Sequence, residues 1–479
     1  MKRAPMRRIE LTALTAVSAM ALAACAGFPS KETPAGIKPA EQYATGRSFA
    51  APAKSWPTDA WWEGYGDPQL GVLIGEALAG SPSIADAEAR LRRAQAIVEV
   101  SGAATVPQVG ANAQVTQQKM SYNYITPKAV TPQGLNDYGL ATLNFSWELD
   151  FWGKNRAALA AATSDADAAA AEAAQARLAL AAAIASAYAE LAREHAALDT
   201  AQAALEVRAQ TADLFRRRYE NGLETLGGVR QVESRRAAAE ADVLSIKEQL
   251  GLQRNRIAAL MGAGPDRGLA IARPTVDLAQ SFGLPKRLAA ELLGRRPDVV
   301  AARLRAEAAA KRIDQARAAF YPNVNLAGFI GVQSLGLDRL AKSGSSTSSA
   351  GPAISLPIFD GGALRGQLKS AQADYAQAVA NYDRTLVQAL QDVADAAVSQ
   401  KALGGQLERT GEAVDAAREA WRIQNDRYQG GLSSYLDVLS TEDTLLSSLR
   451  TLTDLQSRSF TLDVALVKAL GGGYQTQHD

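Results

Sequence analysis

The segment LATLNFSWELDFWG, residues 140–153, decides the fold. Its apolar side chains occupy every second position, and polar ones lie between them. The apolar positions are Ala141, Leu143, Phe145, Trp147, Leu149 and Phe151. This period of two predicts a β-strand with one apolar and one polar face. The alanine-rich stretch that follows, residues 157–191, favours helix strongly. The chain therefore combines long helices with a strand that carries a large aromatic face.

Composition argues against several classes of function. The 479 residues carry a formal net charge of +1, which gives no electrostatic basis for binding nucleic acid. Only two histidines occur, His195 within an expected helix and His478 near the end of the chain. No G-x-S-x-G motif, P-loop or cluster of metal ligands is present. We therefore expect no enzyme activity, no cofactor and no metal site.

The N-terminus has the pattern of an export signal. Residues 1–24 contain a basic start and an apolar stretch from 11 to 24, too short for an ordinary membrane helix. The single cysteine, Cys25, directly follows Leu-Ala-Ala and resembles the acylated cysteine of a bacterial lipobox. Ala26 follows it, which by the habit of such lipoproteins implies sorting to the outer membrane. Residues 25–60 are rich in proline and predict a lipid anchor with an extended tether.

The chain contains an internal duplication. Three pairs of segments match in the same order: 81–110 with 296–325, 147–159 with 356–368, and 218–223 with 427–432. The last pair reads RYENGL and RYQGGL. Such ordered self-similarity predicts two copies of one structural unit.

Each copy is expected to contain a β-hairpin and a pair of long helices. The first repeat, 61–285, has predicted strands near 106–118 and 138–152 and helices within 154–262. The second, 286–472, has strands near 321–333 and 350–360 and helices within 362–470, before a tail at 473–479. No proline interrupts either helical region, and the glycines of the two RYxxGL segments are natural turn residues.

The alternating strands are typical of a transmembrane β-barrel. In lipid, strands span only as a closed barrel with an apolar outer face. We expect the lipid-facing side chains to include Leu143, Phe145, Trp147, Leu149 and Leu356. Four strands are too few to enclose a lumen, because even small closed barrels take about eight. Three chains would supply 12 strands around an open interior, so the pattern favours a homotrimer.

Several motifs together resemble those of a known family. The lipobox, the duplicated hairpin-and-helix unit, the stretches WELDFWGKNR and LPIFDGG, and the paired RYxxGL turns are similar to those of the TolC-like outer membrane efflux proteins. Within these, the chain resembles most the NodT-type lipoproteins of resistance-nodulation-division (RND) pumps. The resemblance implies a trimeric 12-stranded barrel in the outer membrane, continued by an α-helical barrel with a mixed equatorial domain. It also implies a periplasmic adaptor and an inner-membrane RND-type transporter as partners.

The resemblance places functional residues at the periplasmic tip. The two turns are expected to dock the adaptor through Arg218, Tyr219, Asn221, Gly222, Leu223, Arg427, Gly430, Gly431 and Leu432. The channel constriction is expected to involve Tyr428, Leu436, Asp437 and Leu439. Ser433 and Ser440 depart from the arginine and the second acid that some relatives have there. Three copies of Asp437 around the axis would form an anionic ring that favours cations.

Two other functions remain open at this stage. The same channel could serve type I protein secretion, although the lipobox and the NodT-like stretches favour small-molecule efflux. Alternatively, the chain could be a periplasmic scaffold lipoprotein whose sheet packs on itself. The strand alternation argues against the scaffold.

Overall fold

The computed structural model describes residues 36–38, 42–123, 127–276, 283–285 and 288–475. The expected signal peptide and Cys25 lie outside these residues. The chain divides into two compact units. The sheet unit comprises 92–168 and 302–382 among the described residues, and the helical unit comprises 38–91, 169–301 and 383–479 with the gaps given above.

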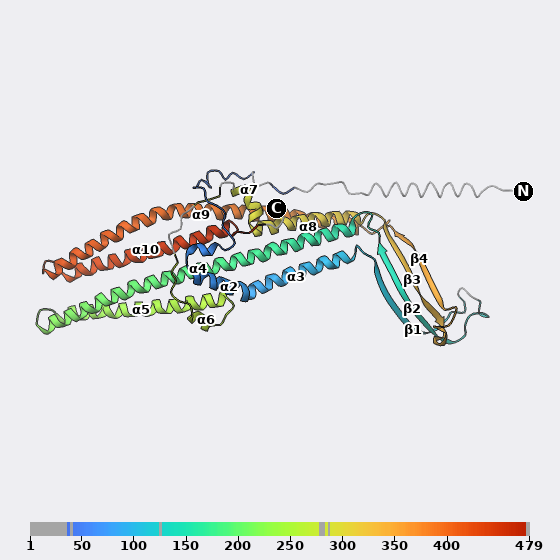
Figure 1. Cartoon of the computed structure of the whole chain (residues 1–479), viewed down its shortest axis with the longest axis horizontal. Helices are drawn as coiled ribbons and strands as arrows, with labels where there is room; N and C mark the ends of the chain where they lie inside the picture. The colour runs from blue at the N-terminus through green and yellow to red at the C-terminus, as the bar shows by residue number, and fades with distance from the viewer. Residues whose placement is uncertain (1–35, 39–41, 124–126, 277–282, 286–287, 476–479) are drawn as a thin grey trace. The chain divides into compact units, whose positions relative to one another are not determined.

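The sheet unit contains one antiparallel sheet of four strands (Figure 1). Its strands are β1 (Gln108–Lys119), β2 (Leu135–Glu148), β3 (Asn323–Leu335) and β4 (Ser346–Ser355), in the order β1-β2-β3-β4. The prediction of two matched hairpins is confirmed. The strands predicted at 138–152 and 350–360 both end earlier, at Glu148 and Ser355. Leu149 and Leu356 are therefore each one residue beyond a strand, although the Leu149 N–H still donates to the Val324 carbonyl at 2.8 Å.

The strand register gathers the apolar side chains on one face. Residues directly opposite in an antiparallel pair share a face, and Val109 lies opposite Phe145, which lies opposite Gly328. The same register continues to β4, where Ile354 lies opposite Val324. The apolar side chains and glycines of this face include Val109, Ala111, Ala113, Val115, Gly139, Ala141, Leu143, Phe145, Trp147, Val324, Leu326, Gly328, Ile330, Val332, Ala350, Pro352 and Ile354. Ser346 and Ser348 of β4 lie on the same face. The opposite face is mostly Gln, Asn, Ser and Thr, and its large apolar or aromatic exceptions are Tyr138, Leu140, Phe329 and Leu335.

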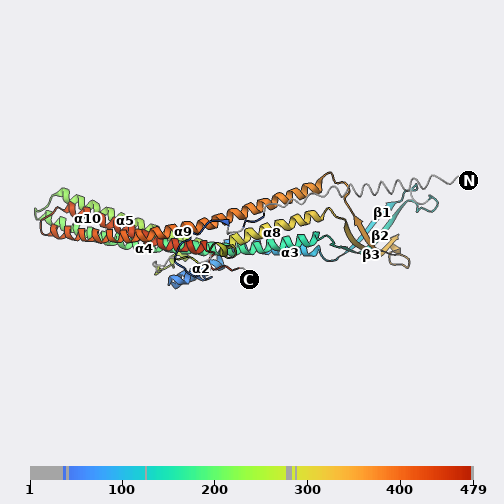
Figure 2. The ribbon, with the colours of Figure 1, turned by 90° about the horizontal axis from the view of Figure 1, so that it is seen from above.

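The two repeats have long helices of equal length. Helices α4 (Lys154–Glu220) and α9 (Ala363–Gln429) each have 67 residues, and α5 (Leu226–Leu260) and α10 (Tyr435–Ala469) each have 35. At 1.5 Å per residue, 67 residues extend about 100 Å. Each repeat also has a 22-residue helix before its first strand, α3 (Pro82–Ala103) and α8 (Pro297–Ala318). Figure 2 gives a second view of these helices.

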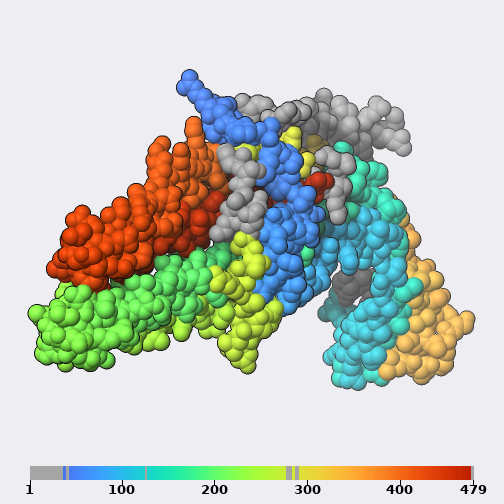
Figure 3. Space-filling model, turned by 60° about the vertical axis from the view of Figure 1, so that its left-hand side comes forward, coloured from blue at the N-terminus to red at the C-terminus, as the bar shows by residue number. Residues whose placement is uncertain are grey.

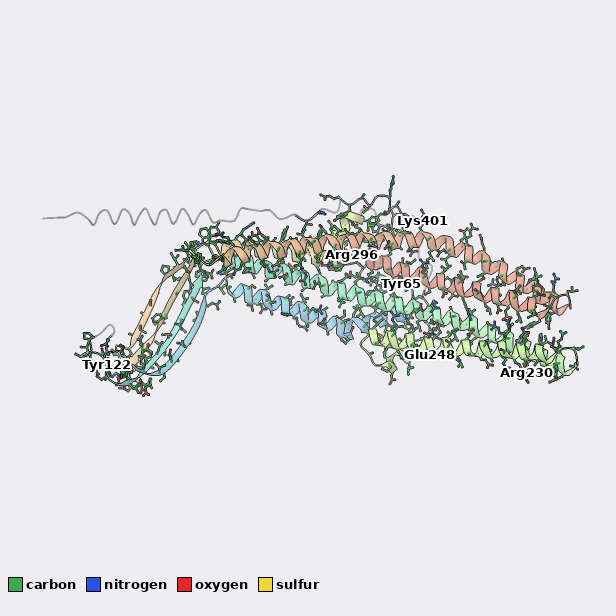
Figure 4. The ribbon with its side chains drawn as sticks, turned by 180° about the vertical axis from the view of Figure 1, so that it is seen from behind. Tyr65, Tyr122, Arg230, Glu248, Arg296 and Lys401 are labelled. Atoms are coloured by element: carbon green, nitrogen blue, oxygen red, sulfur yellow. The ribbon has the colours of Figure 1, made fainter. Side chains whose placement is uncertain are left out.

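The core of the helical unit surrounds the middle of α4. The short elements η2 (Trp61–Tyr65) and α2 (Pro68–Gly80) pack there. Helix α6 (Pro265–Leu269) contacts α5, and α7 (Leu288–Arg295) precedes α8. The Tyr188 hydroxyl donates to Asp67 at 2.8 Å, and the Tyr65 hydroxyl donates to Asp463 at 2.6 Å. Buried Arg296 bonds Asp298, Asp392 and the Ala469 carbonyl, and so ties α8 to α9 and α10. Figure 4 labels Tyr65 and Arg296.

The end of the expected tether is packed against the helical unit. The Leu284 N–H donates to the Pro52 carbonyl at 2.9 Å, and the Lys54 N–H donates to the Leu284 carbonyl at 3.0 Å. The Trp56 ring lies 4.9 Å from the Arg295 guanidinium carbon. Proline content alone predicted an extended segment through residue 60, but two backbone hydrogen bonds hold residues 52–54 as a docked strap.

Candidate functional site

The two helical turns at the tip have the same backbone geometry. In the first, the Gly222 N–H donates to the Tyr219 carbonyl at 2.9 Å and the Leu223 N–H donates to the Arg218 carbonyl at 2.8 Å. In the second, Gly431 and Leu432 repeat these bonds to Tyr428 and Arg427 at 3.0 and 2.8 Å. This pair of bonds is the Schellman motif, which needs a residue with positive φ. The two central glycines supply it, with φ values of 70° and 73°.

Different residues cap the helices that leave the two turns. The Thr225 hydroxyl accepts from the Gly228 N–H at the start of α5. Ser434 and Asp437 form a full capping box at the start of α10, in which the Asp437 carboxylate accepts from the Ser434 N–H at 3.0 Å and its hydroxyl at 2.8 Å. Asp437 is exposed, but its carboxylate already orders the helix start.

An aromatic cluster joins the tips of the two hairpins. The Tyr435 ring of α10 lies 4.7 Å from Phe215 of α4 and 5.5 Å from Tyr428 of α9. The Arg218 guanidinium carbon lies 5.8 Å from the Tyr428 ring, within range of a cation–π contact. Tyr428 therefore packs between the hairpins in a single chain.

Two polar atoms of this cluster have no hydrogen-bond partner within the described residues. They are the Tyr428 hydroxyl and the Arg218 Nε, both buried. Burial raises the pKa of Tyr428, while the neighbouring Arg218 charge acts in the opposite direction. Buried polar groups are nearly always bonded, so these two atoms are exceptions to the usual pattern.

The predicted docking residues include large exposed apolar side chains. Leu223 is 68% exposed and Leu432 is 73% exposed, at equivalent positions of the two turns. Leu436 is 58% exposed, whereas Leu439 is only 1% exposed and packs inside the chain. Of the two leucines predicted at the constriction, the structure thus leaves Leu436 available to a lumen and uses Leu439 for packing.

A ladder of ion pairs crosses from the first hairpin to α10. Arg208 of α4 bonds Glu442 and Asp443, each at 3.1 Å, and Arg235 of α5 bonds Asp443 at 3.1 Å. Farther along, Arg450 of α10 bonds Asp242 of α5 at 3.4 Å. Figure 3 shows the green hairpin beside the orange and red one. Sequence patterns do not predict this ladder, because its partners are more than 200 residues apart.

The ladder contains one buried carboxylate. Glu442 is 5% exposed, and burial raises its pKa, while the Arg208 charge and hydrogen bond lower it. The net direction is a raised pKa, so burial outweighs the opposing charge and hydrogen bond of Arg208.

The predicted lipid-facing residues lie on the apolar face of the sheet or just beyond it. Leu143 is 52% exposed, whereas Phe145 and Trp147 are half-buried in one chain. The Trp147 Nε1 donates to the Thr105 carbonyl at 3.2 Å. At the helix-side end of the sheet, the Trp152 ring stacks on Tyr321 at 4.5 Å. A tryptophan and a tyrosine at one end of an apolar strand face fit an aromatic girdle.

Within the described part of the chain, no group of three or more His, Cys, Asp or Glu side chains is placed to hold a metal ion.

Comparison with known proteins identifies the family. The family model described as outer membrane efflux protein matches residues 73–263 and 288–472. Among curated proteins, the chain is 30% identical over 446 residues to the multidrug resistance outer membrane protein MdtP of Escherichia coli K12, covering 92% of this chain and 91% of that protein. It is 40% identical over 324 residues to the fusaric acid resistance protein FusA of Burkholderia cepacia. That match covers 66% of this chain and 60% of FusA.

Comparison with solved structures indicates the same family. The crystal structure of the outer membrane protein VceC of Vibrio cholerae superimposes with a TM-score of 0.83, at 50% sequence identity, covering 88% of this chain and all of that one. The predicted TolC-like architecture is thereby confirmed. The two matched ranges contain all four strands, all four long helices and both tip turns. The chain therefore belongs to the outer membrane efflux protein family and is an exit duct for efflux across the outer membrane.

Proposed function

We propose that three copies of this chain close one 12-stranded barrel. The observation that carries the proposal is the continuous apolar face of a sheet with two open edges. In the described chain, β1 and β4 each have only one neighbouring strand. An open edge in hydrocarbon would leave a row of unpaired N–H and C=O groups, which is prohibitively costly. Pairing β1 of one subunit with β4 of the next removes every edge.

The proposed duct receives small molecules from an inner-membrane RND-type transporter through a periplasmic adaptor. The exposed Leu223 and Leu432 support adaptor docking, because paired apolar side chains at equivalent turns give a partner two similar contacts. The duct itself is passive, and the transporter supplies the energy. The MdtP and FusA names, which refer to multidrug and fusaric acid resistance, support efflux of small toxic molecules.

The position of Lys38 is compatible with a lipid anchor at Cys25. Lys38 lies 3.8 Å from Asp383 of α9, which is 20 residues after the first residue of that helix. That distance is about 30 Å along the helix. The 13 residues from Cys25 to Lys38 can span about 45 Å at most. The chain is thus long enough for an acylated cysteine at the membrane surface beside the start of α9.

Mass spectrometry of the detergent-purified protein tests both the trimer and the anchor. The native spectrum is expected to show three chains. The denatured spectrum is expected to show chains that lack residues 1–24 and carry added acyl mass. A Cys25→Ser variant is the control, and it should lose the acyl mass while it keeps the trimer. A stable single-chain species in lipid-like detergent would refute the barrel, and an unmodified Cys25 would refute the anchor.

We also propose that Tyr428, Leu436 and Asp437 narrow the tip, with Asp437 giving an anionic ring. Exposure of Leu436 and Asp437 supports this role. In planar bilayers, Asp437→Asn should reduce the preference for cations, measured as a shift of reversal potential across a salt gradient. Asparagine retains an oxygen for the capping box, so the helix start should remain intact.

The matched control is Asp415→Asn, which removes an exposed acid of α9 paired with Arg418. This control should leave the reversal potential unchanged. An equal shift in both variants would mean that general charge, rather than a ring at the tip, sets selectivity.

A further inference from the structure

We infer that Lys119 and Lys128, the lysine pair, bind phosphate headgroups of the lipids that surround the loop end of the barrel. The inference rests on the proposed function, because it requires the apolar face of the sheet to contact lipid. The pair lies at the β1–β2 turn, where Figure 4 labels Tyr122 at the end of the sheet. The lipid class is defined by its phosphate-bearing headgroup.

The strand register places Lys119 on the lipid-facing side. Lys119 lies opposite Leu135, and it shares its face with Val115 four residues earlier in β1. Beyond Val115 this face carries Gln117, Asp137 and Lys119, and Leu135 is its one apolar side chain there. Four residues of strand extend about 13 Å. The ammonium group therefore lies beyond the apolar band, at the level where headgroups meet the barrel.

A tyrosine ring brings the two lysines together. The Tyr122 ring centre lies 5.5 Å from the Lys119 Nζ and 5.9 Å from the Lys128 Nζ. The two ammonium groups are therefore within about 11 Å of each other. The Tyr122 hydroxyl accepts from the Gly134 N–H at 3.0 Å, so the ring is fixed to the far side of the turn.

The segment that carries Lys128 is itself an ordered turn. The N–H and hydroxyl of Thr131 donate to the Pro127 carbonyl at 3.2 and 3.0 Å, and Thr131 is buried. The Gln133 Nε2 donates to the Lys128 carbonyl at 2.9 Å. The backbone on both sides of the lysine is thus held in place, which reduces the entropy lost when the side chain binds a ligand.

No carboxylate of the described residues forms an ion pair with either lysine. The nearest acid on the same face of the hairpin, Asp137, instead accepts from Gln117 Nε2 at 3.4 Å. The β3–β4 turn differs, because there Lys342 is bonded to Asp338 at 2.9 Å. The β3–β4 turn therefore has one acid beside its two cations, Arg339 and Lys342, whereas the β1–β2 turn presents two cations without a counter-charge among the described residues.

Phosphate is the chemistry that this arrangement fits. Lysine binds phosphate as a point charge. A basic side chain near an anionic lipid surface changes the affinity for that surface about fivefold. Two such side chains on one platform should together change affinity about 30-fold.

The test measures lipid retained by the purified full-length protein. Native mass spectrometry would compare a glycolipid that carries phosphate with the same glycolipid after removal of its phosphate. The protein should bind the phosphorylated form, and Lys119→Gln with Lys128→Gln should weaken that binding about 30-fold. The matched control, Lys342→Gln, should leave binding unchanged because that lysine is already paired with Asp338.

Three results would overturn the inference. They are unchanged binding by the double variant, equal loss in Lys342→Gln, and displacement of the lipid by millimolar inorganic phosphate, which would indicate a site for free anions. Bilayer conductance of the double variant separates this inference from the proposed function. If conductance persists while lipid binding is unaffected, the inference fails and the duct stands. If no variant or wild-type protein conducts, the duct itself fails.

Discussion

The two hairpins of the helical unit, α4–α5 and α9–α10, share their geometry but differ in how they are held. Their helices have equal lengths, and both turns have the same bonds and positive-φ glycines. The first hairpin is tied internally by Arg216 and Glu233, at 2.6 Å. In the second, α10 is tied to its neighbour by the ladder from Arg208. Duplication thus preserved the turn that reverses the chain, while the links between helices diverged.

Glycine content also separates α4 from α9, the two long helices. The 67 residues of α4 contain no glycine, whereas α9 contains Gly366, Gly404, Gly405 and Gly411. A β-carbon added at any of these four would meet nothing within 4 Å in this chain. Each glycine within a helix costs about 1 kcal/mol relative to alanine. Relative to α4, α9 therefore carries a cost in helix stability for which packing inside the subunit gives no reason. The first hairpin has its helix glycines in α5, at Gly227, Gly228 and Gly251.

The largest expected effect comes from breaking the ladder at its buried end. Arg208→Met should reduce the free energy of unfolding by about 3 kcal/mol, because Glu442 is left buried without its partner. The measurement is thermal unfolding of the purified protein followed by circular dichroism. Arg450→Met is the control. Its ion pair with Asp242 is exposed on both sides, so its removal should cost less than about 1 kcal/mol.

The pH dependence of this variant follows from Glu442. Burial already raises the pKa of Glu442 in the folded chain, and loss of Arg208 should raise that pKa further. A folded chain that holds a proton more tightly than the unfolded chain is relatively more stable at low pH and loses stability as pH rises above the unfolded pKa. The free energy of unfolding that Arg208→Met loses relative to the wild-type protein should thus be smaller near pH 5 than near pH 8. An equal loss of unfolding free energy at both pH values would show that Glu442 does not cause the instability of the variant.

The sequence predicts the framework of both hairpins better than the contacts between them. Absence of proline and the two RYxxGL segments are local signals, so they located the long helices and their turns. Leu436 and Leu439 show the limit. They lie three residues apart near the start of one helix, yet one is exposed and the other buried. Which side of α10 meets the first hairpin depends on tertiary packing. The same holds for Arg208 and Glu442, which are 234 residues apart.

The tether and the strands show two other limits. Proline content indicated an extended segment, but the bonds of Leu284 to residues 52 and 54 depend on a backbone distant in sequence. For the strands, the alternation of apolar and polar residues correctly predicted which side chains share a face. Only the first and last residues of the strands differ from the prediction. The apolar positions Leu356 and Ile358 continue the alternation past the last β4 residue, Ser355. Pro357 lacks the N–H that a ladder needs, and Gly361 and Gly362 turn the chain with positive φ.

A smaller effect, of opposite sign, is expected from the glycines of α9. Gly404→Ala with Gly405→Ala should raise the free energy of unfolding by about 1 kcal/mol per site, because the added methyl groups find open space and alanine favours helix. The readout is the midpoint of the same thermal unfolding curve. If its glycines are what makes α9 less stable than α4, the double variant makes α9 resemble α4.

The control for this variant is a glycine that the turn requires. Gly431→Ala places a β-carbon at φ 73°, which should cost about 1 to 2 kcal/mol, and Gly222→Ala at φ 70° should cost the same. A loss of stability or of trimer in the α9 double variant would reverse the argument. The open space beside Gly404 and Gly405 in one chain would then be filled by the backbone of another at close range, and the glycines would be packing residues. The sign of one shift in the unfolding midpoint thus decides whether α9 is intrinsically weaker than α4 or is packed against a neighbouring chain at its glycines.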